Sequence, residues 1–118
     1  MFAANEIDYL CHNGLIQRIV DSGLYDNIAN LAAAAIERET GYTAATLSDS
    51  QKEQLMPAFA YIVNYLAESQ ITGLTADARE IIRSKYEGAL KILRQFAKAP
   101  ADYNDNADVV DFLGAPSW

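Results

Sequence analysis

The chain has 118 residues, of which 16 are acidic and nine are basic, and its formal net charge of −7 disfavours a nucleic-acid partner. A chain of this length forms one domain, because single hydrophobic cores serve roughly 50–200 residues. A single cysteine, Cys11, excludes an internal disulfide framework, and a single histidine, His12, excludes a zinc site built mainly from cysteine and histidine.

No stretch of the sequence has the features of a membrane or export segment. The longest apolar run, residues 31–36, is far shorter than the ~18 residues that a membrane-spanning helix needs. The start of the chain lacks the basic residues of a signal peptide. We therefore expect a soluble protein without an export signal, and the single cysteine favours a reducing compartment.

The first part of the chain predicts short helices followed by an amphipathic one. Residues 5–20 carry apolar residues at helical spacing, but Asn13 and Gly14 interrupt them, which predicts two short pieces. Residues 24–40 have the 3.6-residue apolar period and stop before Gly41, a common helix C-cap residue. The predicted core face of this helix consists of Leu24, Ile28, Leu31, Ala32, Ala35 and Ile36.

A long helix is predicted over residues 48–70. Ser48 and Gln51 have the spacing of a capping box, in which each side chain satisfies a backbone N–H of the other residue. Pro57 lies inside the helix and predicts a kink around the core, because proline lacks one backbone donor and crowds the preceding turn. The predicted buried stripe consists of Leu55, Phe59, Ile62, Val63 and Leu66.

A second long helix is predicted to begin after Thr75 and to end near Lys98. Its predicted core face consists of Ile82, Tyr86, Ala89, Leu90, Leu93, Phe96 and Ala97. The linker over residues 71–74 is so short that the two long helices must fold back as an antiparallel hairpin. The sequence therefore predicts an all-α fold, a small helical bundle built on a long antiparallel hairpin, with shorter N-terminal helices, over residues 1–98.

The last segment, residues 99–118, is predicted to be an extended tail. It contains four aspartates and no basic residue, together with bulky apolar groups that water disfavours leaving exposed. Such a tail either folds back on its own domain or docks on another subunit, and both alternatives stay open. The residues predicted to dock are Val109, Val110, Phe112, Leu113 and Trp118.

Charge is distributed unevenly along the chain. Residues 1–75 carry nine acids and three bases, whereas residues 76–98 carry three acids and six bases. Five of these bases form a stripe opposite the predicted core face of the last helix: Arg79, Arg83, Lys91, Arg94 and Lys98. The stripe is either a solvated helix face or a subunit interface that meets the acidic surface of a neighbouring copy.

The sequence holds no constellation of residues that predicts catalysis. Cys11 and His12 are neighbours that point in different directions, and no glycine-rich oxyanion or phosphate loop accompanies them. The acidic residues lack the spacing of di-metal bundles and of calcium loops. Tyr61, Tyr65 and Tyr86 lie near the apolar stripes, which favours packing over base stacking. We therefore predict no enzyme and no catalytic, metal or cofactor site.

Three segments carry a resemblance to a known family. The first is an alanine-rich helix over residues 28–37 that ends in an acidic turn. The second is the capped helix start over residues 47–53, which continues to residues 62–66. The third covers residues 86–93 and is followed by Phe96 and Ala97. In their order and pattern the chain resembles the small helical head-tail connector (adaptor) proteins of tailed bacteriophages and Mu-like prophages. It departs from many members at Gly41 and Tyr42, where they have an Arg-Tyr pair and a proline.

The resemblance implies a structural virion protein. Copies would form a ring, expected to be a dodecamer, below the portal protein and would offer a surface to a tail completion or stopper protein. DNA would pass through the channel without specific binding, and the tail would grip the portal. The protein would be found at the head-tail junction of the virion and, during assembly, in the host cytoplasm. The alternative is a small acidic phage-encoded regulatory module that binds a host protein.

Overall fold

A computed structural model of the chain describes residues 1–97, and the regular secondary structure of this part consists of helices joined by loops, with no strand. The elements in chain order are α1 (Ala4–Ile7), the short 3₁₀ helix η1 (Asp8–Leu10), α2 (Leu15–Asp21), α3 (Tyr25–Thr40), α4 (Asp49–Glu68) and α5 (Ala76–Phe96). The predicted all-α class is confirmed. The predicted tail and its apolar residues lie outside the described residues, and so does Lys98.

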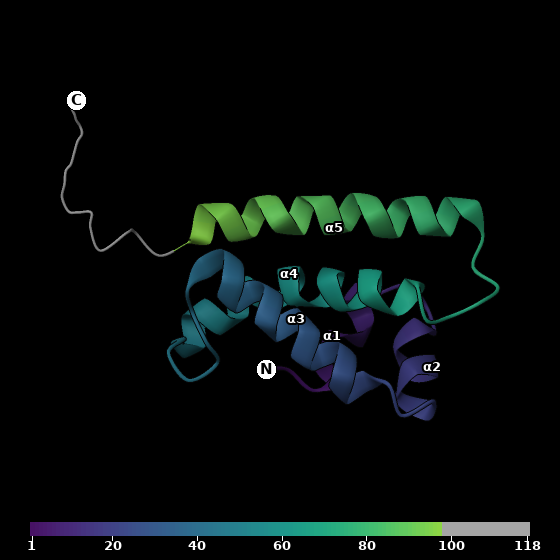
Figure 1. Ribbon diagram of the computed structural model, residues 1–118, viewed down its shortest axis with the longest axis horizontal. Coiled ribbons are helices and arrows are strands. Elements are labelled where there is room, and N and C mark those ends of the chain that lie inside the picture. Colours follow the sequence, from purple (N-terminus) through teal and green to yellow (C-terminus); the bar gives the residue numbers. More distant parts are fainter. Residues whose placement is uncertain (98–118) are drawn as a thin grey trace.

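The two long helices form the predicted antiparallel pair. Helix α5 lies along α4 and runs in the opposite direction, with the loop between them at one end of the molecule (Figure 1). The Ser48 hydroxyl accepts a hydrogen bond from the N–H of Gln51, and the Gln51 side chain accepts from the N–H of Ser48. The Thr75 hydroxyl caps α5 by accepting from the N–H of Ala78. The starts of both helices are therefore fixed by local side-chain hydrogen bonds.

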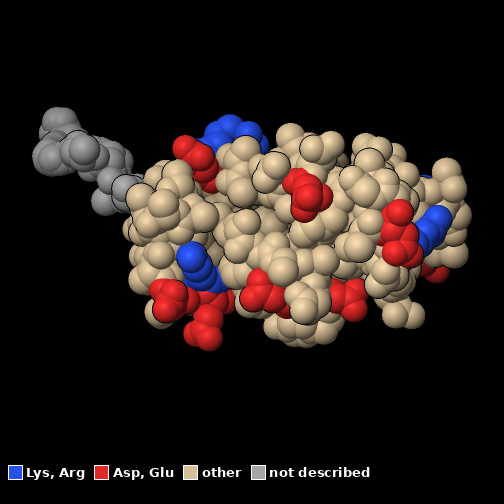
Figure 2. All heavy atoms as spheres, turned by 90° about the horizontal axis from the view of Figure 1, so that it is seen from below, with Lys and Arg blue, Asp and Glu red and all other residues tan. Residues whose placement is uncertain are grey.

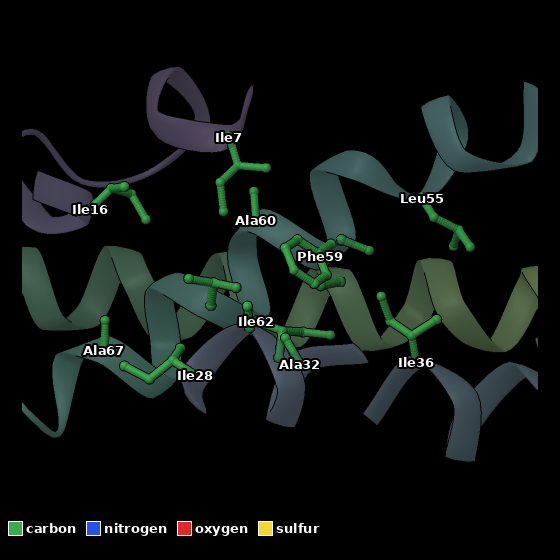
Figure 3. Packing of buried hydrophobic residues seen from close by; sticks show 14 of the residues in the cluster. Ile7, Ile16, Ile28, Ala32, Ile36, Leu55, Phe59, Ala60, Ile62 and Ala67 are labelled. Atoms are coloured by element: carbon green, nitrogen blue, oxygen red, sulfur yellow. The ribbon is translucent and has the colours of Figure 1, made fainter. Parts of the chain in front are cut away.

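Helix α4 occupies the centre of the bundle. It lies between α5 on one side and the N-terminal helices on the other (Figure 1). Its side chains are buried around most of its circumference. Pro57 lies inside the helix, which continues past it to Glu68. Residues of α1, α2 and α3 converge on the same core around Phe59 (Figure 3). A helix that is surrounded by other helices needs apolar residues on several faces, and the sequence of α4 has them.

The N-terminal segment is fastened to the long hairpin by polar contacts. Gly14 adopts a left-handed backbone (φ 80°) between the short helices, at the predicted interruption. The N–H of His12 donates to Oδ1 of the buried Asn64 on α4 at 3.1 Å. The Arg18 guanidinium donates to the carbonyl of Thr72 in the α4–α5 loop at 3.0 Å. These contacts connect residues more than 50 positions apart in the sequence.

The buried face of α3 differs from the predicted one. Leu31 was expected in the core but is 59% exposed, whereas Ala29 and Thr40, which were not expected there, are buried. The helix is rotated about its axis so that its contact with α4 centres on Ala32 and Ile36. The small Ala32 allows close approach on that side, so Leu31 is left on the outer flank. Ala97, predicted in the core face of α5, is also exposed, because the helix ends at Phe96.

Candidate interaction surface on helix α5

Helix α5 is the outermost element of the bundle. Its inner side packs on α4 and α3, and the opposite side faces away from the other helices (Figure 1). The buried residues of the helix are Ala78, Ile82, Ala89 and Leu93. Because a helix with one buried stripe exposes the remaining sides, α5 offers the longest continuous helical surface in residues 1–97.

Aromatic contacts fix which side of α5 faces outward. The rings of Tyr65 on α4 and Tyr86 on α5 are stacked, with centroids 3.9 Å apart and an interplanar angle of 8°. The Lys85 ammonium lies 5.6 Å from the centre of the Tyr61 ring. The prediction that these tyrosines serve packing is confirmed for the Tyr65–Tyr86 pair. Such contacts resist rotation of α5 and so determine which residues it exposes.

The predicted basic stripe is only partly free. Arg83, Lys91 and Arg94 are exposed, as a stripe opposite the core requires. Arg79 is instead half-buried, and its Nη1 lies 2.6 Å from Oε2 of Glu68, the last residue of α4. This arginine therefore closes the hairpin within the chain. Lys98 lies outside the described residues, and the interface role of all five residues stays a prediction.

Exposed apolar residues on α5 were missed by the sequence reasoning. Ile81 is 56% exposed and Ile92 is 37% exposed, and Gly88 lies between them on the same side. The signal was present in the sequence, since residues 81, 88 and 92 are spaced by seven and four and so share one helix face outside the predicted core stripe. Exposed isoleucines rimmed by polar residues are typical of a contact with another protein.

The surface on the other side of the bundle is more acidic. Viewed from the side opposite α5, acidic groups are scattered over the face and outnumber the basic ones (Figure 2). This agrees with the nine acids and three bases of residues 1–75. The molecule therefore separates charge, with basic side chains concentrated on α5 and acidic ones on the remaining helices.

Cys11, the residue with the most nucleophilic side chain, is placed in an environment that suppresses its reactivity. Its Sγ donates to the carbonyl of Ala60 at 3.4 Å. Burial raises the pKa of the thiol to about 12; the Asp8 carboxylate adds to the rise and Lys85 opposes it. Because the thiolate is the nucleophilic form, the thiol is a poor nucleophile at neutral pH.

Two shallow, open depressions on α5 are lined by side chains of that one helix, among them Arg83, Ser84 and Glu87. Within residues 1–97, no three His, Cys, Asp or Glu side chains come close enough to hold a metal ion. Among the helices of residues 1–97, none combines the length and the hydropathy that a membrane span requires.

The comparisons with known proteins provide no relative. No protein family model, curated protein or solved structure matches the chain.

Proposed function

We propose that this chain is a structural subunit of the head-tail connector type that its sequence resembles. In this role it forms a ring under a portal protein, joins the ring to a tail completion or stopper protein, and surrounds the DNA channel. Its place is the head-tail junction of the virion. The protein acts by binding other proteins and transforms no substrate.

The separation of charge between α5 and the remaining helices is the observation that carries this proposal. Arg83, Lys91 and Arg94 project from the outer helix, whereas residues 1–75 bear three times as many acids as bases. A contact between α5 of one copy and the acidic side of the next is electrostatically favourable. Because it joins two different surfaces, such a contact is heterologous and closes into a ring when its rotation allows.

The net charge fits a channel wall. Each contact between a basic group and a phosphate holds back DNA that moves through a ring. The affinity for DNA rises steeply with the number of such contacts. A subunit with a net charge of −7 offers few such contacts when its bases face a neighbouring copy. An acidic lumen thus lets DNA pass without specific binding.

The proposal is tested by mixing the full-length chain with the portal protein encoded nearest to it and recording native mass spectra. We expect a ring of this chain on the portal. Arg83→Glu should abolish or markedly reduce the ring, whereas Arg38→Glu, the same charge change on an exposed residue of α3, should leave it intact.

Failure of the wild-type chain to bind the portal would contradict the connector role. If the chain instead captured one host protein under the same conditions, the alternative of an acidic regulatory module would replace it. Deletion of residues 101–118 tests the predicted grip of the tail: heads and tails should no longer join, and normal particles from the truncated chain would refute the anchoring role.

A further inference from the structure

The outer side of α5 has a second surface beside the basic residues. We call it the isoleucine face and define it by Ile81, Ser84, Gly88 and Ile92. The two isoleucines at its ends are exposed, and the two small residues lie between them. An added Cβ at Gly88 would meet no atom within 4 Å, so nothing inside the chain requires glycine at this position.

Charged residues along one edge of this face follow a definite order. Asp77 and Glu80 lie in the first turns of α5, and Lys91 and Arg94 lie in the last turns. In the described part of the chain, none of these four residues takes part in an ion pair, because the only salt bridge there joins Arg79 to Glu68. Next to the isoleucine face, this edge is therefore negative at its start, at Asp77 and Glu80, and positive near its end, at Lys91; Arg94 lies farther round the helix, beside Arg83 and Glu87.

We propose that the isoleucine face binds the same face of a second copy of this chain, with the two α5 helices antiparallel around a two-fold axis. The axis passes midway between residues 81 and 92, so that Ile81 of one copy meets Ile92 of the other. Residues related in this way contact each other twice, as in every two-fold interface. The contact covers four isoleucine side chains that each monomer exposes to water.

The order of charges selects the antiparallel arrangement. In the register that joins Ile81 to Ile92, Glu80 of one copy lies about 3 Å along the axis from Lys91 of the other, on the same edge of the contact. A parallel two-fold arrangement would instead bring this edge of one helix against the opposite edge of the other, which carries Lys85 and no acidic residue, so Lys91 would meet no carboxylate. Opposed helix dipoles favour the antiparallel pair as well.

The small residues allow the two helices to approach. In the same register Gly88 of each copy lies close to the two-fold axis, where the backbones come nearest, and Ser84 lies next to it. A side chain larger than methyl at this point holds the helices apart. Glycine inside a helix lowers the stability of the helix. The close packing of a second backbone against Gly88 offsets this loss.

This inference is independent of the proposed function. The ring contact joins α5 to a different surface of the next copy, with Arg83 on the far side of the basic stripe from the isoleucine face. The two-fold pair joins α5 to α5. Lys91 lies at both contacts, whereas Arg83 belongs to the ring contact alone and Gly88 to the two-fold pair alone, so variants at these two positions test the two contacts separately.

Sedimentation equilibrium of the full-length chain, without any portal protein, tests the pair. We expect a concentration-dependent equilibrium between monomer and dimer. Gly88→Leu should weaken association at least about tenfold, while it raises or preserves the thermal unfolding midpoint, because leucine favours the helix and finds open space in the monomer. The unchanged or higher midpoint distinguishes a lost contact from a lost fold.

A charge exchange tests the orientation. Glu80→Lys should weaken the dimer, and the double variant Glu80→Lys with Lys91→Glu should restore it, since opposite charges again meet. Arg83→Glu, outside the isoleucine face, should leave the dimer unchanged. A wild-type chain that stays monomeric up to about 1 mM, a dimer that Gly88→Leu does not weaken, or a double variant as weak as the single one would each overturn the proposal.

Discussion

Arg79 at the start of α5 and Glu68 at the end of α4 form an ion pair with 2.6 Å between Nη1 and Oε2, on opposite sides of the loop that reverses the chain. The Glu68 side chain is only 10% exposed, whereas that of Arg79 is 39% exposed. The pair thus gives a nearly buried carboxylate a partner that the sequence pattern had assigned to the outer surface. The ion pair joins the end of α4 to the start of α5, next to the loop that connects the two helices.

Replacement of Arg79 alone should therefore lower the free energy of unfolding more than replacement of both Arg79 and Glu68. Arg79→Ala should lower the free energy of unfolding by about 1–2 kcal/mol, because Glu68 is left in a buried position without its partner. Urea unfolding followed by circular dichroism measures this, with Arg83→Ala on the exposed side of α5 as a control that changes it by less than about 0.5 kcal/mol. If Glu68→Ala and Arg79→Ala turned out to be additive in the double variant, the interaction would contribute nothing.

The rotation of α3 predicts a contrast between two large apolar residues. Phe59 is fully buried at the centre of the core and its ring lies 5.0 Å from that of Phe2, whereas Leu31 lies mostly in solvent. Phe59→Ala should lower the free energy of unfolding by about 3–5 kcal/mol, since it leaves a cavity. Leu31→Ala should change it by less than about 0.5 kcal/mol in the same urea titration. A loss above about 2 kcal/mol for Leu31→Ala would mean that the orientation of α3 is wrong.

The capping box of α4 makes a local prediction. Ser48→Ala removes the acceptor for the N–H of Gln51 and should destabilise the protein by about 1 kcal/mol. Ser50 lies in the first turn of the same helix, is exposed, and makes no hydrogen bond of its side chain within residues 1–97, so Ser50→Ala serves as the matched control and should be neutral or slightly stabilising. Thermal unfolding of both variants under one buffer condition separates the two effects. Equal midpoints would argue against the cap.

The half-buried thiol of Cys11 predicts slow alkylation and a loss of stability in alkali. In the folded chain burial raises the pKa of the thiol to about 12, whereas an unfolded thiol releases its proton near the ordinary pKa of about 9.0. At pH 8 the folded chain therefore has about a thousandfold less thiolate than the unfolded one, and iodoacetamide should label Cys11 far more slowly in buffer than in concentrated urea.

The same shift has a thermodynamic consequence. Above pH 9 the unfolded state loses a proton that the folded state keeps, so the contribution of Cys11 to stability is present below that pH and falls as the pH rises toward 12. The free energy of unfolding should therefore decrease more steeply over this range in the wild type than in Cys11→Ala. Burial likewise raises the pKa of Tyr25 to about 12, and the Cys11 charge adds to this rise, so Cys11→Ala also reduces the contribution of Tyr25 and changes the slope in the same direction. Identical slopes would show that the thiol is not buried as described.

The sequence by itself determined the local elements of this protein. The positions of Ser48, Thr75 and Gly41 predicted where long helices begin or end, and the short linker predicted the antiparallel hairpin, which the structure confirms. These features depend on interactions between residues three or four positions apart, so they can be recognised without knowledge of the fold. The uneven charge along the chain could also be predicted directly.

Only the tertiary structure decided how each helix is rotated about its axis. That rotation exposes Leu31 and Ile81, buries Thr40, turns Arg79 back to Glu68 and places Asn64 beneath the N–H of His12. A helical period identifies an apolar stripe about 100° wide, but the residues at its edges become buried or exposed according to what packs against them. The contacts that settle this join residues far apart in the chain, and for that reason the exposure of Ile81 and the ion pair between Arg79 and Glu68 could be established only after the helices were in place.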